Sequence, residues 1–186
     1  MKITYEGLPE IDLPDLNAET IPAAEALLAP VLTSYLGPQT GQAVAVLGAG
    51  CGLAAFVCLF RGAKVTVIEP QEACRRRFAK TQAANRPRGN GSLSLKTDIG
   101  NLQDDRFDLV LYLGTEGISL DQAIKLGGQF LRNHGRLLLF VPSKEVRREA
   151  EKLLESDCWT GIQILESQSW GRNGNCRYIL EACHAV

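Results

Sequence analysis

The chain has 186 residues, the size of a single domain that can bury a core without disulfides or a structural metal. Hydrophobic residues make up 45% of it and charged residues 22%, which are proportions typical of a globular protein rather than a disordered one. The formal net charge is -1. A general nucleic-acid-binding function is therefore not expected, because proteins of that class carry an excess of positive charge that attracts the phosphates.

The cysteines and the start of the chain point to the cytoplasm. Six cysteines are scattered without a CxxC pair, and the first residues, MKITYEGLPE, lack the basic and apolar runs of a secretory signal. No apolar run is long enough to cross a bilayer, so no membrane association is expected. Neither His134 nor His184 has cysteine or acidic neighbours at the spacing of metal ligands, and no metal site is predicted.

Residues 1–40 are predicted to form an approach segment or lid ahead of one domain that spans residues 41–186. Thr20 is expected to cap a helix in IPAAEALLAPVL, with Pro22 near the helix start. Pro30 is expected to kink or end this helix, because a proline lacks the amide hydrogen that the helix interior needs.

From Gly41 onward, short apolar runs alternate with stretches of helical periodicity, which is typical of βαβ units. Seven strands are predicted, from Ala43 to Leu47, Lys64 to Ile68, Ser92 to Lys96, Arg106 to Leu113, Arg136 to Val141, Ile162 to Ser167 and Arg177 to Ala182. Four helices are predicted, from Leu53 to Arg61, Gln71 to Asn85, Leu120 to Leu131, and after Ser143 as their cap. The sheet is expected to be mainly parallel, with its last two strands paired as an antiparallel hairpin across the turn-rich Trp170 to Asn175.

The most informative segment is the glycine-rich turn after the first of these strands. Gly48-Ala49-Gly50-Cys51-Gly52 joins the apolar run VAVL directly to a helix. Glycines suit a turn in which the backbone reverses sharply and a ligand approaches where a Cβ would collide. Amide hydrogens at the start of the helix would be free to donate to that ligand.

An acidic residue, Glu69, ends the next strand about 20 residues later. A carboxylate at that spacing is expected beside the end of the first strand, where it can accept from both hydroxyls of a ribose. The dinucleotide pattern GxGxxG would require glycine at position 53, which is occupied by Leu53. The third glycine comes one residue early, and the pattern is GxGxG.

GxGxG followed by an acidic strand end resembles the cofactor loop of the class I S-adenosylmethionine-dependent methyltransferases. The resemblance covers the chain from about Val44 to the C-terminus, including the final hairpin, and implies a Rossmann-like three-layer α/β sandwich. It also implies S-adenosylmethionine as the cofactor and a small-molecule or protein methyl acceptor.

The resemblance implies roles for particular residues. Gly48, Ala49, Gly50 and Gly52 would approach the methionine and ribose portions of the cofactor, and Glu69 would bind the ribose hydroxyls. Pro70, Asp98 and Ile99 would surround the adenine, while Leu113 and Gly114 would line the mouth of methyl transfer. For Asp98 an alternative stays open, because it could simply begin the turn Asp98-Ile99-Gly100-Asn101.

Catalytic residues are not identified by the sequence. The motif of an Asn or Asp followed by Pro-Pro-aromatic, found in family members that methylate nitrogen, is replaced here by Leu113-Gly114-Thr115-Glu116-Gly117. Glu116 is the one candidate that could orient an amine or hydroxyl acceptor, although an exposed loop acid is the favoured interpretation. The basic run Arg75-Arg76-Arg77 could touch an anionic substrate or form a solvated helix face.

Three functions follow from these observations. The first is an S-adenosylmethionine-dependent methyltransferase. The second is a methyltransferase-like domain that has lost catalysis and binds a partner, which the unusual residues after the fourth strand favour. The third is a fragment of an FAD- or NAD-binding oxidoreductase, for which Glu69 is suitable but Leu53 is not.

Overall fold

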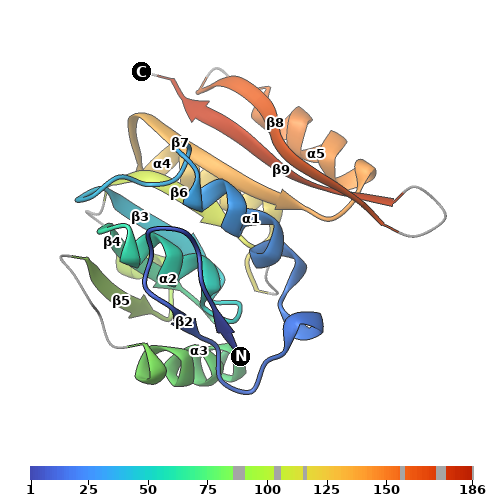
Figure 1. Cartoon of the computed structure of the whole chain (residues 1–186). Coiled ribbons are helices and arrows are strands. Elements are labelled where there is room, and N and C mark those ends of the chain that lie inside the picture. The colour runs from blue at the N-terminus through green and yellow to red at the C-terminus, as the bar shows by residue number, and fades with distance from the viewer. Residues whose placement is uncertain (86–90, 103–105, 115–116, 156–157, 171–174, 186) are drawn as a thin grey trace.

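The computed structural model describes residues 1–85, 91–102, 106–114, 117–155, 158–170 and 175–185 (Figure 1). Its centre is a seven-stranded sheet with the spatial order β5-β4-β3-β6-β7-β9-β8. The strands are β3 (Ala43–Leu47), β4 (Lys64–Ile68), β5 (Ser92–Lys96), β6 (Phe107–Tyr112), β7 (Leu131–Val141), β8 (Trp159–Trp170) and β9 (Asn175–His184). Neighbouring strands from β5 to β7 are parallel, and β9 runs antiparallel to both β7 and β8. The predicted mainly parallel sheet with a C-terminal antiparallel hairpin is confirmed.

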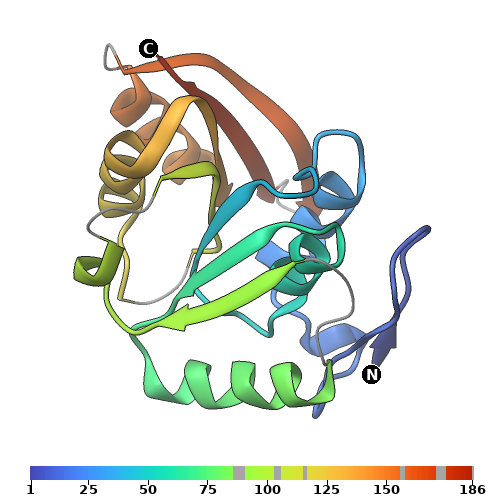
Figure 2. The same ribbon diagram turned by 90° about the vertical axis from the view of Figure 1, so that its left-hand side faces the viewer.

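Helices cover both faces of the sheet, which gives three layers (Figure 2). The helices are α1 (Ala23–Thr33), α2 (Leu53–Phe60), α3 (Glu72–Ala84), α4 (Leu120–Phe130) and α5 (Lys144–Leu154). One core cluster contains the apolar residues of α1 and α2 together with Phe78 of α3, and the other contains those of α4 and α5. Within the described residues, no helix is both long and apolar enough to cross a membrane.

Strand β3 lies between these two cores because its side chains alternate between the faces of the sheet. Val44 and Val46 belong to the cluster under α1 and α2, whereas Ala45 and Leu47 belong to the cluster under α4 and α5. All four are buried. A strand that is buried on both faces reads as a continuous apolar run, which is why its bounds agree with the prediction from the sequence.

The N-terminal residues form a small hairpin outside the main sheet, made of β1 (Lys2–Ile3) and β2 (Ile11–Asp12). It is attached to α3 through Asn85, whose Oδ1 accepts from the Asp12 amide at 2.7 Å and whose Nδ2 donates to the Asp12 carbonyl. Ile11 and Leu13 are completely buried. This segment therefore contributes to the core.

The predicted cap of the first long helix is wrong, and so is one of the two alternatives given for Pro30. Thr20 does not cap it, because Thr20 ends the short 3-10 helix η1 (Ala18–Thr20), where it exchanges capping hydrogen bonds with Asn17. Helix α1 starts later, after Pro22, without a side-chain cap. Pro30 does not end α1 either, since the helix continues to Thr33. A proline removes only one helical hydrogen bond, and the buried residues on either side of Pro30 pack into the core.

The strand predicted to begin at Arg136 starts five residues earlier, at Leu131. Strand β7 begins at Leu131, directly after α4, and the Leu131 amide closes that helix by donating to the Gly127 carbonyl. His134 lies inside β7 with a left-handed φ of 61°. Leu131 pairs with Phe107 but Arg136 already pairs with Leu109, so the extra residues of β7 are accommodated as an irregularity in the strand.

Candidate functional site

The site lies where the order of the strands reverses. The chain runs outward from β3 to β4 and β5, then crosses to β6 and β7 on the other side of β3. The carboxyl ends of β3 and β6 therefore flank the switch point of the sheet, and ligands of open α/β sheets bind outside the strand ends at such a point. The segments that follow β3, β4, β5 and β6 all meet at this edge (Figure 1).

The turn from β3 to α2 has the backbone that the glycines suggested. Gly48, Gly50 and Gly52 have φ values of 100°, 53° and 97°, a region that residues with a Cβ rarely adopt. Space is limited too. A Cβ at Gly52 would lie 3.1 Å from the Thr81 methyl group, and one at Gly50 would lie 2.4 Å from Oε2 of Glu25.

Glu69 reaches from the end of β4 to this turn. Its Oε2 accepts from the Ala49 amide at 2.8 Å, and its Oε1 accepts from the Gln71 amide at 2.8 Å. The spacing in the sequence predicted that the carboxylate lies beside the end of the first strand, and it does. Both oxygens are, however, held by backbone amides, and the side chain has an exposed fraction of 0%.

A second carboxylate, which the sequence analysis missed, holds the other half of the turn. Glu25 of α1 accepts from the Cys51 amide through Oε2 at 2.6 Å and from the Ala54 amide through Oε1 at 3.1 Å. These amides belong to the turn and to the first residues of α2, where the helix dipole favours a negative charge. The sequence feature that could have identified Glu25 is that it is the one acidic residue in the otherwise apolar stretch IPAAEALLAPVL.

Burial changes the proton affinity of this group. The Glu25 side chain has an exposed fraction of 0%, and this burial raises its pKa above the ordinary value, although hydrogen bonds from Cys51 and Ala54 oppose the change. Burial, reinforced by the charge of Glu25, also raises the pKa of the Cys51 thiol. The thiol is therefore protonated at neutral pH and is not an activated nucleophile.

A cavity of about 130 Å³ opens at the ends of β4 and β5. It is lined by Ile68, Pro70, Thr97, Asp98, Ile99 and Gly117. The fold thus brings together Pro70, Asp98 and Ile99, the three residues expected around an adenine. The alternative for Asp98 also holds, because its Oδ1 accepts from the Gly100 amide at 2.7 Å and begins a turn.

Gly117 is a lining residue that the sequence analysis did not select. Its φ is 95°, and a Cβ there would lie 3.1 Å from Cγ of Pro70. Its position in a glycine-containing loop after β6 is the sequence feature that could have identified it as a lining residue.

The two residues expected at the mouth of the site follow β6. Leu113 is buried, and its amide donates to the Leu47 carbonyl at 3.1 Å, which places it beside the start of the glycine turn. Gly114 has a φ of 69°, and a Cβ there would lie 3.1 Å from the Phe140 ring. Glu116, the only catalytic candidate, lies outside the described residues. Within those residues, no group of three or more His, Cys, Asp or Glu side chains could hold a metal ion.

Comparison with known proteins bears on the fold. The sequence matches no family model and no curated protein. Solved structures do match, among them the precorrin-6y C5,15-methyltransferase of Geobacter metallireducens, with a TM-score of 0.66 and 18% identity over 84% of this chain and 88% of the other.

Two further matches have similar scores. An S-adenosylmethionine-dependent O-methyltransferase of Thermotoga maritima has a TM-score of 0.66 and 16% identity, over 89% of this chain and 66% of its own. The magnesium protoporphyrin IX methyltransferase of Synechocystis, solved with S-adenosylmethionine bound, has a TM-score of 0.65 and 17% identity, over 87% and 78%. The chain therefore has the Rossmann-like fold of the class I S-adenosylmethionine-dependent methyltransferases.

Proposed function

We propose that this protein is an S-adenosylmethionine-dependent methyltransferase that acts on a small-molecule or protein acceptor. The observation that carries the proposal is Glu69, a carboxylate at the end of β4 that touches the Ala49 amide of a glycine turn at the switch point of the sheet. Solved structures of the same fold are named as S-adenosylmethionine-dependent enzymes, and one holds this molecule. The cofactor would supply a methyl group on a positively charged sulfur for transfer to the acceptor.

The residues present fit the adenosine end of this cofactor. The cavity beside Pro70, Asp98 and Ile99 offers apolar surface to a base and a carboxylate to its amino group. Glu69 would accept from the ribose hydroxyls, for which each carboxylate oxygen keeps a second acceptor direction beyond the amide it already binds. The left-handed Gly50 would let the cofactor approach the backbone closely.

The part of the site that would hold the methionine portion of the cofactor is occupied by a side chain of the protein. The Glu25 carboxylate lies against Gly50, and the cavity of about 130 Å³ is smaller than the roughly 300–1,000 Å³ of typical small-molecule sites. Binding of the whole cofactor therefore requires the side chains over the turn to shift. Residues 1–40 would act as the cover, with the Glu25 side chain moving while the backbone of α1 stays in place, because Leu28 and Leu32 of α1 are completely buried in the core.

The Glu25 carboxylate against Gly50 also favours a second function, a methyltransferase-like module that binds a partner without catalysis. In that case Glu25 is a permanent substitute for the ligand's negative group at the start of α2, and the turn is structural. The buried position of Glu69 fits this alternative as well.

Calorimetric titration separates these functions. We expect S-adenosylmethionine and S-adenosylhomocysteine to bind, and NADH and FAD not to bind. Binding of the dinucleotides alone would reject the proposal in favour of an oxidoreductase fragment, and binding of none of the four would favour the partner module.

Catalysis is tested separately by incubation with methyl-labelled S-adenosylmethionine and cell extract. Label in a product that depends on the protein supports the enzyme. Cofactor binding without transfer to any product supports a domain that keeps the cofactor site but has lost catalysis, whereas a module with Glu25 as the permanent substitute would bind no cofactor.

A further inference from the structure

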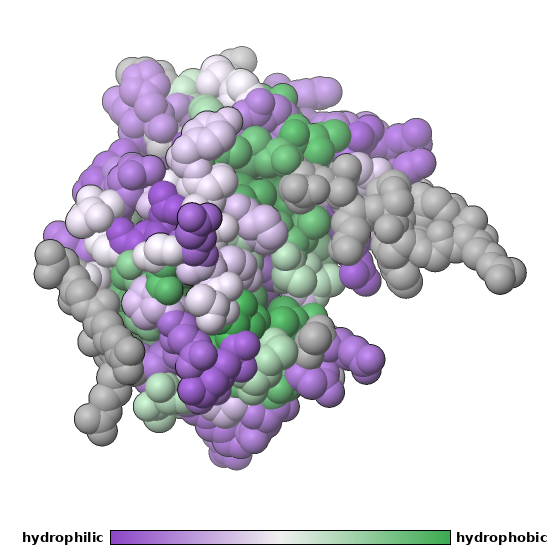
Figure 3. Space-filling view, in the orientation of Figure 1, coloured by the Kyte–Doolittle hydropathy of each residue, from purple (hydrophilic) through white to green (hydrophobic). Residues whose placement is uncertain are grey.

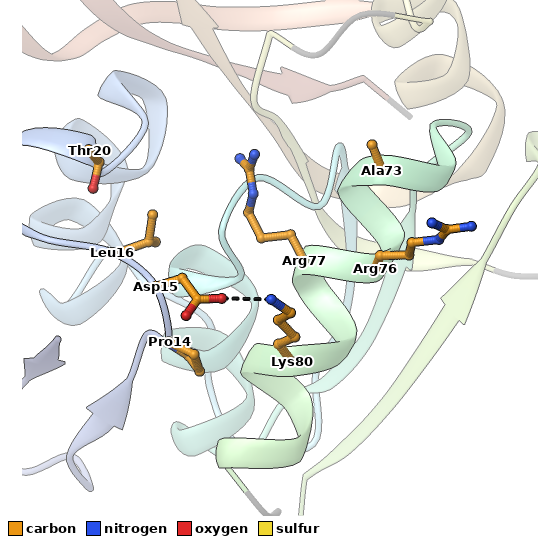
Figure 4. Close-up of a pocket in the computed structure, with 8 residues that line it drawn as sticks. All are labelled: Pro14, Asp15, Leu16, Thr20, Ala73, Arg76, Arg77 and Lys80. Atoms are coloured by element: carbon orange, nitrogen blue, oxygen red, sulfur yellow. Dashed lines mark hydrogen bonds and ion pairs between the residues drawn. The ribbon is translucent and has the colours of Figure 1, made fainter.

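A larger pocket lies outside the glycine turn, between the segment of residues 14–20 and α3 (Figure 4). Its volume is about 610 Å³. It is lined by Pro14, Asp15, Leu16, Thr20, Ala73, Arg76, Arg77 and Lys80. This volume lies within the range of about 300–1,000 Å³ that is typical of small-molecule sites.

Positive charge dominates the lining, which contains three cationic side chains and one carboxylate. Two of the cations are already paired. Lys80 Nζ lies 2.7 Å from Asp15 Oδ2 across the pocket, and Arg76 pairs with Glu72 on its own helix. Both pairs are exposed, so they are weak and can exchange partners.

Arg77 is the exception. Its side chain makes no hydrogen bond or ion pair with any residue that the structure describes. Figure 4 shows the guanidinium extending from α3 into the space toward Leu16 and Thr20, on the same side of the helix as the pair of Lys80 and Asp15. A guanidinium offers a planar fork of donors that matches a carboxylate or a phosphate.

The remaining walls limit what else the ligand can be. Pro14, Leu16 and Ala73 provide apolar surface. The Thr20 hydroxyl is already used, since it accepts from the Asn17 amide and donates to the Asn17 carbonyl. The pocket therefore suits a small molecule with an apolar body and one anionic group.

Both walls of the pocket are close in the sequence to residues of the proposed cofactor site. Its α3 wall begins at Ala73, just after Glu69 and Pro70, and Arg75 fixes this first turn of the helix by donating to the carbonyls of both residues. Its other wall ends at Thr20, just before the helix that carries Glu25. The two walls thus lead to the two carboxylates that hold the glycine turn.

We propose that this pocket binds a small molecule through its carboxylate or phosphate group, with Arg77 as the residue that holds the anion. If the protein is a methyltransferase, as proposed above, this molecule is the methyl acceptor, and the anionic group anchors it beside the cofactor. The binding site itself does not depend on that function.

The test is an NMR titration of the protein, without any cofactor, with inorganic phosphate in one arm and succinate in the other. We expect saturable shifts confined to residues 14–20 and 73–80. The two arms distinguish the anions, because the ligand with the higher affinity shows whether the pocket prefers a phosphate or a carboxylate. Shifts spread over all basic surfaces, or no saturation in either arm, would overturn the proposal.

Two variants with opposite expected effects sharpen the test. Arg77→Gln should weaken binding about tenfold or more, since hydrogen bonds to a charged group are lost. Asp15→Asn should strengthen binding several-fold, because it removes the competing carboxylate and frees Lys80. Asparagine tolerates the left-handed φ of 61° at this position, so the backbone should be kept.

Arg148→Gln is the matched control, because Arg148 is an exposed arginine on α5, far from the pocket along the chain. It removes the same charge and should leave the affinity unchanged. Equal weakening by Arg77→Gln and Arg148→Gln would show a general effect of net charge and overturn the proposal. Titration of Arg77→Gln with S-adenosylmethionine tests the cofactor site separately, because its affinity should match that of the wild type.

Discussion

Removal of the Glu25 carboxylate should destabilise the protein through the two amides that it holds. In Glu25→Ala, the Cys51 and Ala54 amides lose their acceptor at a site with an exposed fraction of 0%. A buried donor without a partner costs about 1–3 kcal/mol, so two cost about 2–6 kcal/mol. Relief from burying a carboxylate offsets part of this. We therefore expect a loss of about 2–4 kcal/mol in the free energy of unfolding.

Urea unfolding at neutral pH, followed by circular dichroism, measures this loss. Glu19→Ala is the control, since Glu19 is exposed in η1 and should change the free energy of unfolding by less than about 0.5 kcal/mol. A Glu25→Ala variant as stable as that control would refute the reasoning, because it would show that the turn keeps its shape without the carboxylate.

The effect should also depend on pH, because burial raises the pKa of Glu25 above its ordinary value. A raised pKa means that the folded protein binds the proton more tightly than the unfolded chain. The contribution of Glu25 is therefore largest below the ordinary glutamate pKa of about 4.3 and declines as the pH rises through the folded value. The difference in unfolding free energy between wild type and Glu25→Ala should be larger at about pH 5 than at about pH 8. An opposite slope would contradict the assigned direction.

Three further predictions follow from the site and the core. Glu69→Gln should weaken S-adenosylmethionine binding about tenfold or more in calorimetry, because a charged acceptor of the ribose is lost; unchanged affinity would remove Glu69 from the site. Gly52→Ala should lower the Tm more than Gly7→Ala, since both have positive φ but only the former meets neighbouring atoms; equal losses would exclude the packing effect. Cys58, whose pKa burial raises to about 12, should react with iodoacetamide more slowly than the partly exposed Cys74, as mass spectrometry can measure; equal rates would show that the core opens readily.

The long-range details of the glycine turn could not be predicted from the sequence. Gly48, Gly50 and Gly52 were identifiable because only glycine readily adopts the left-handed backbone that a sharp turn requires. Glu69 was identifiable because parallel strands of known length bring their ends together. Glu25 was not, since nothing in a local pattern says whether the one acid of a helix points inward toward an amide 26 residues away.

The same distinction applies to the edges of the elements. Thr20 has the residue type of a helix cap, but it ends a separate short helix whose start is capped by Asn17. The irregularity at His134 arises from the register between β6 and β7, and register is a property of two strands rather than of one. At Thr20 one local capping pattern replaced another, whereas at His134 pairing with a distant strand decided the backbone.

The alternation of apolar runs and the glycine turn determined the α/β class, the strands and the position of the candidate site, because these depend on periodicity and backbone freedom within short windows. Only the tertiary structure decided that the Glu25 carboxylate binds the glycine turn. It also decided that residues 14–20 face α3 across a pocket that includes Arg77, which pairs with none of the described residues. These contacts join segments far apart in the chain. Their geometry depends on how whole elements pack, which no local stretch of sequence contains.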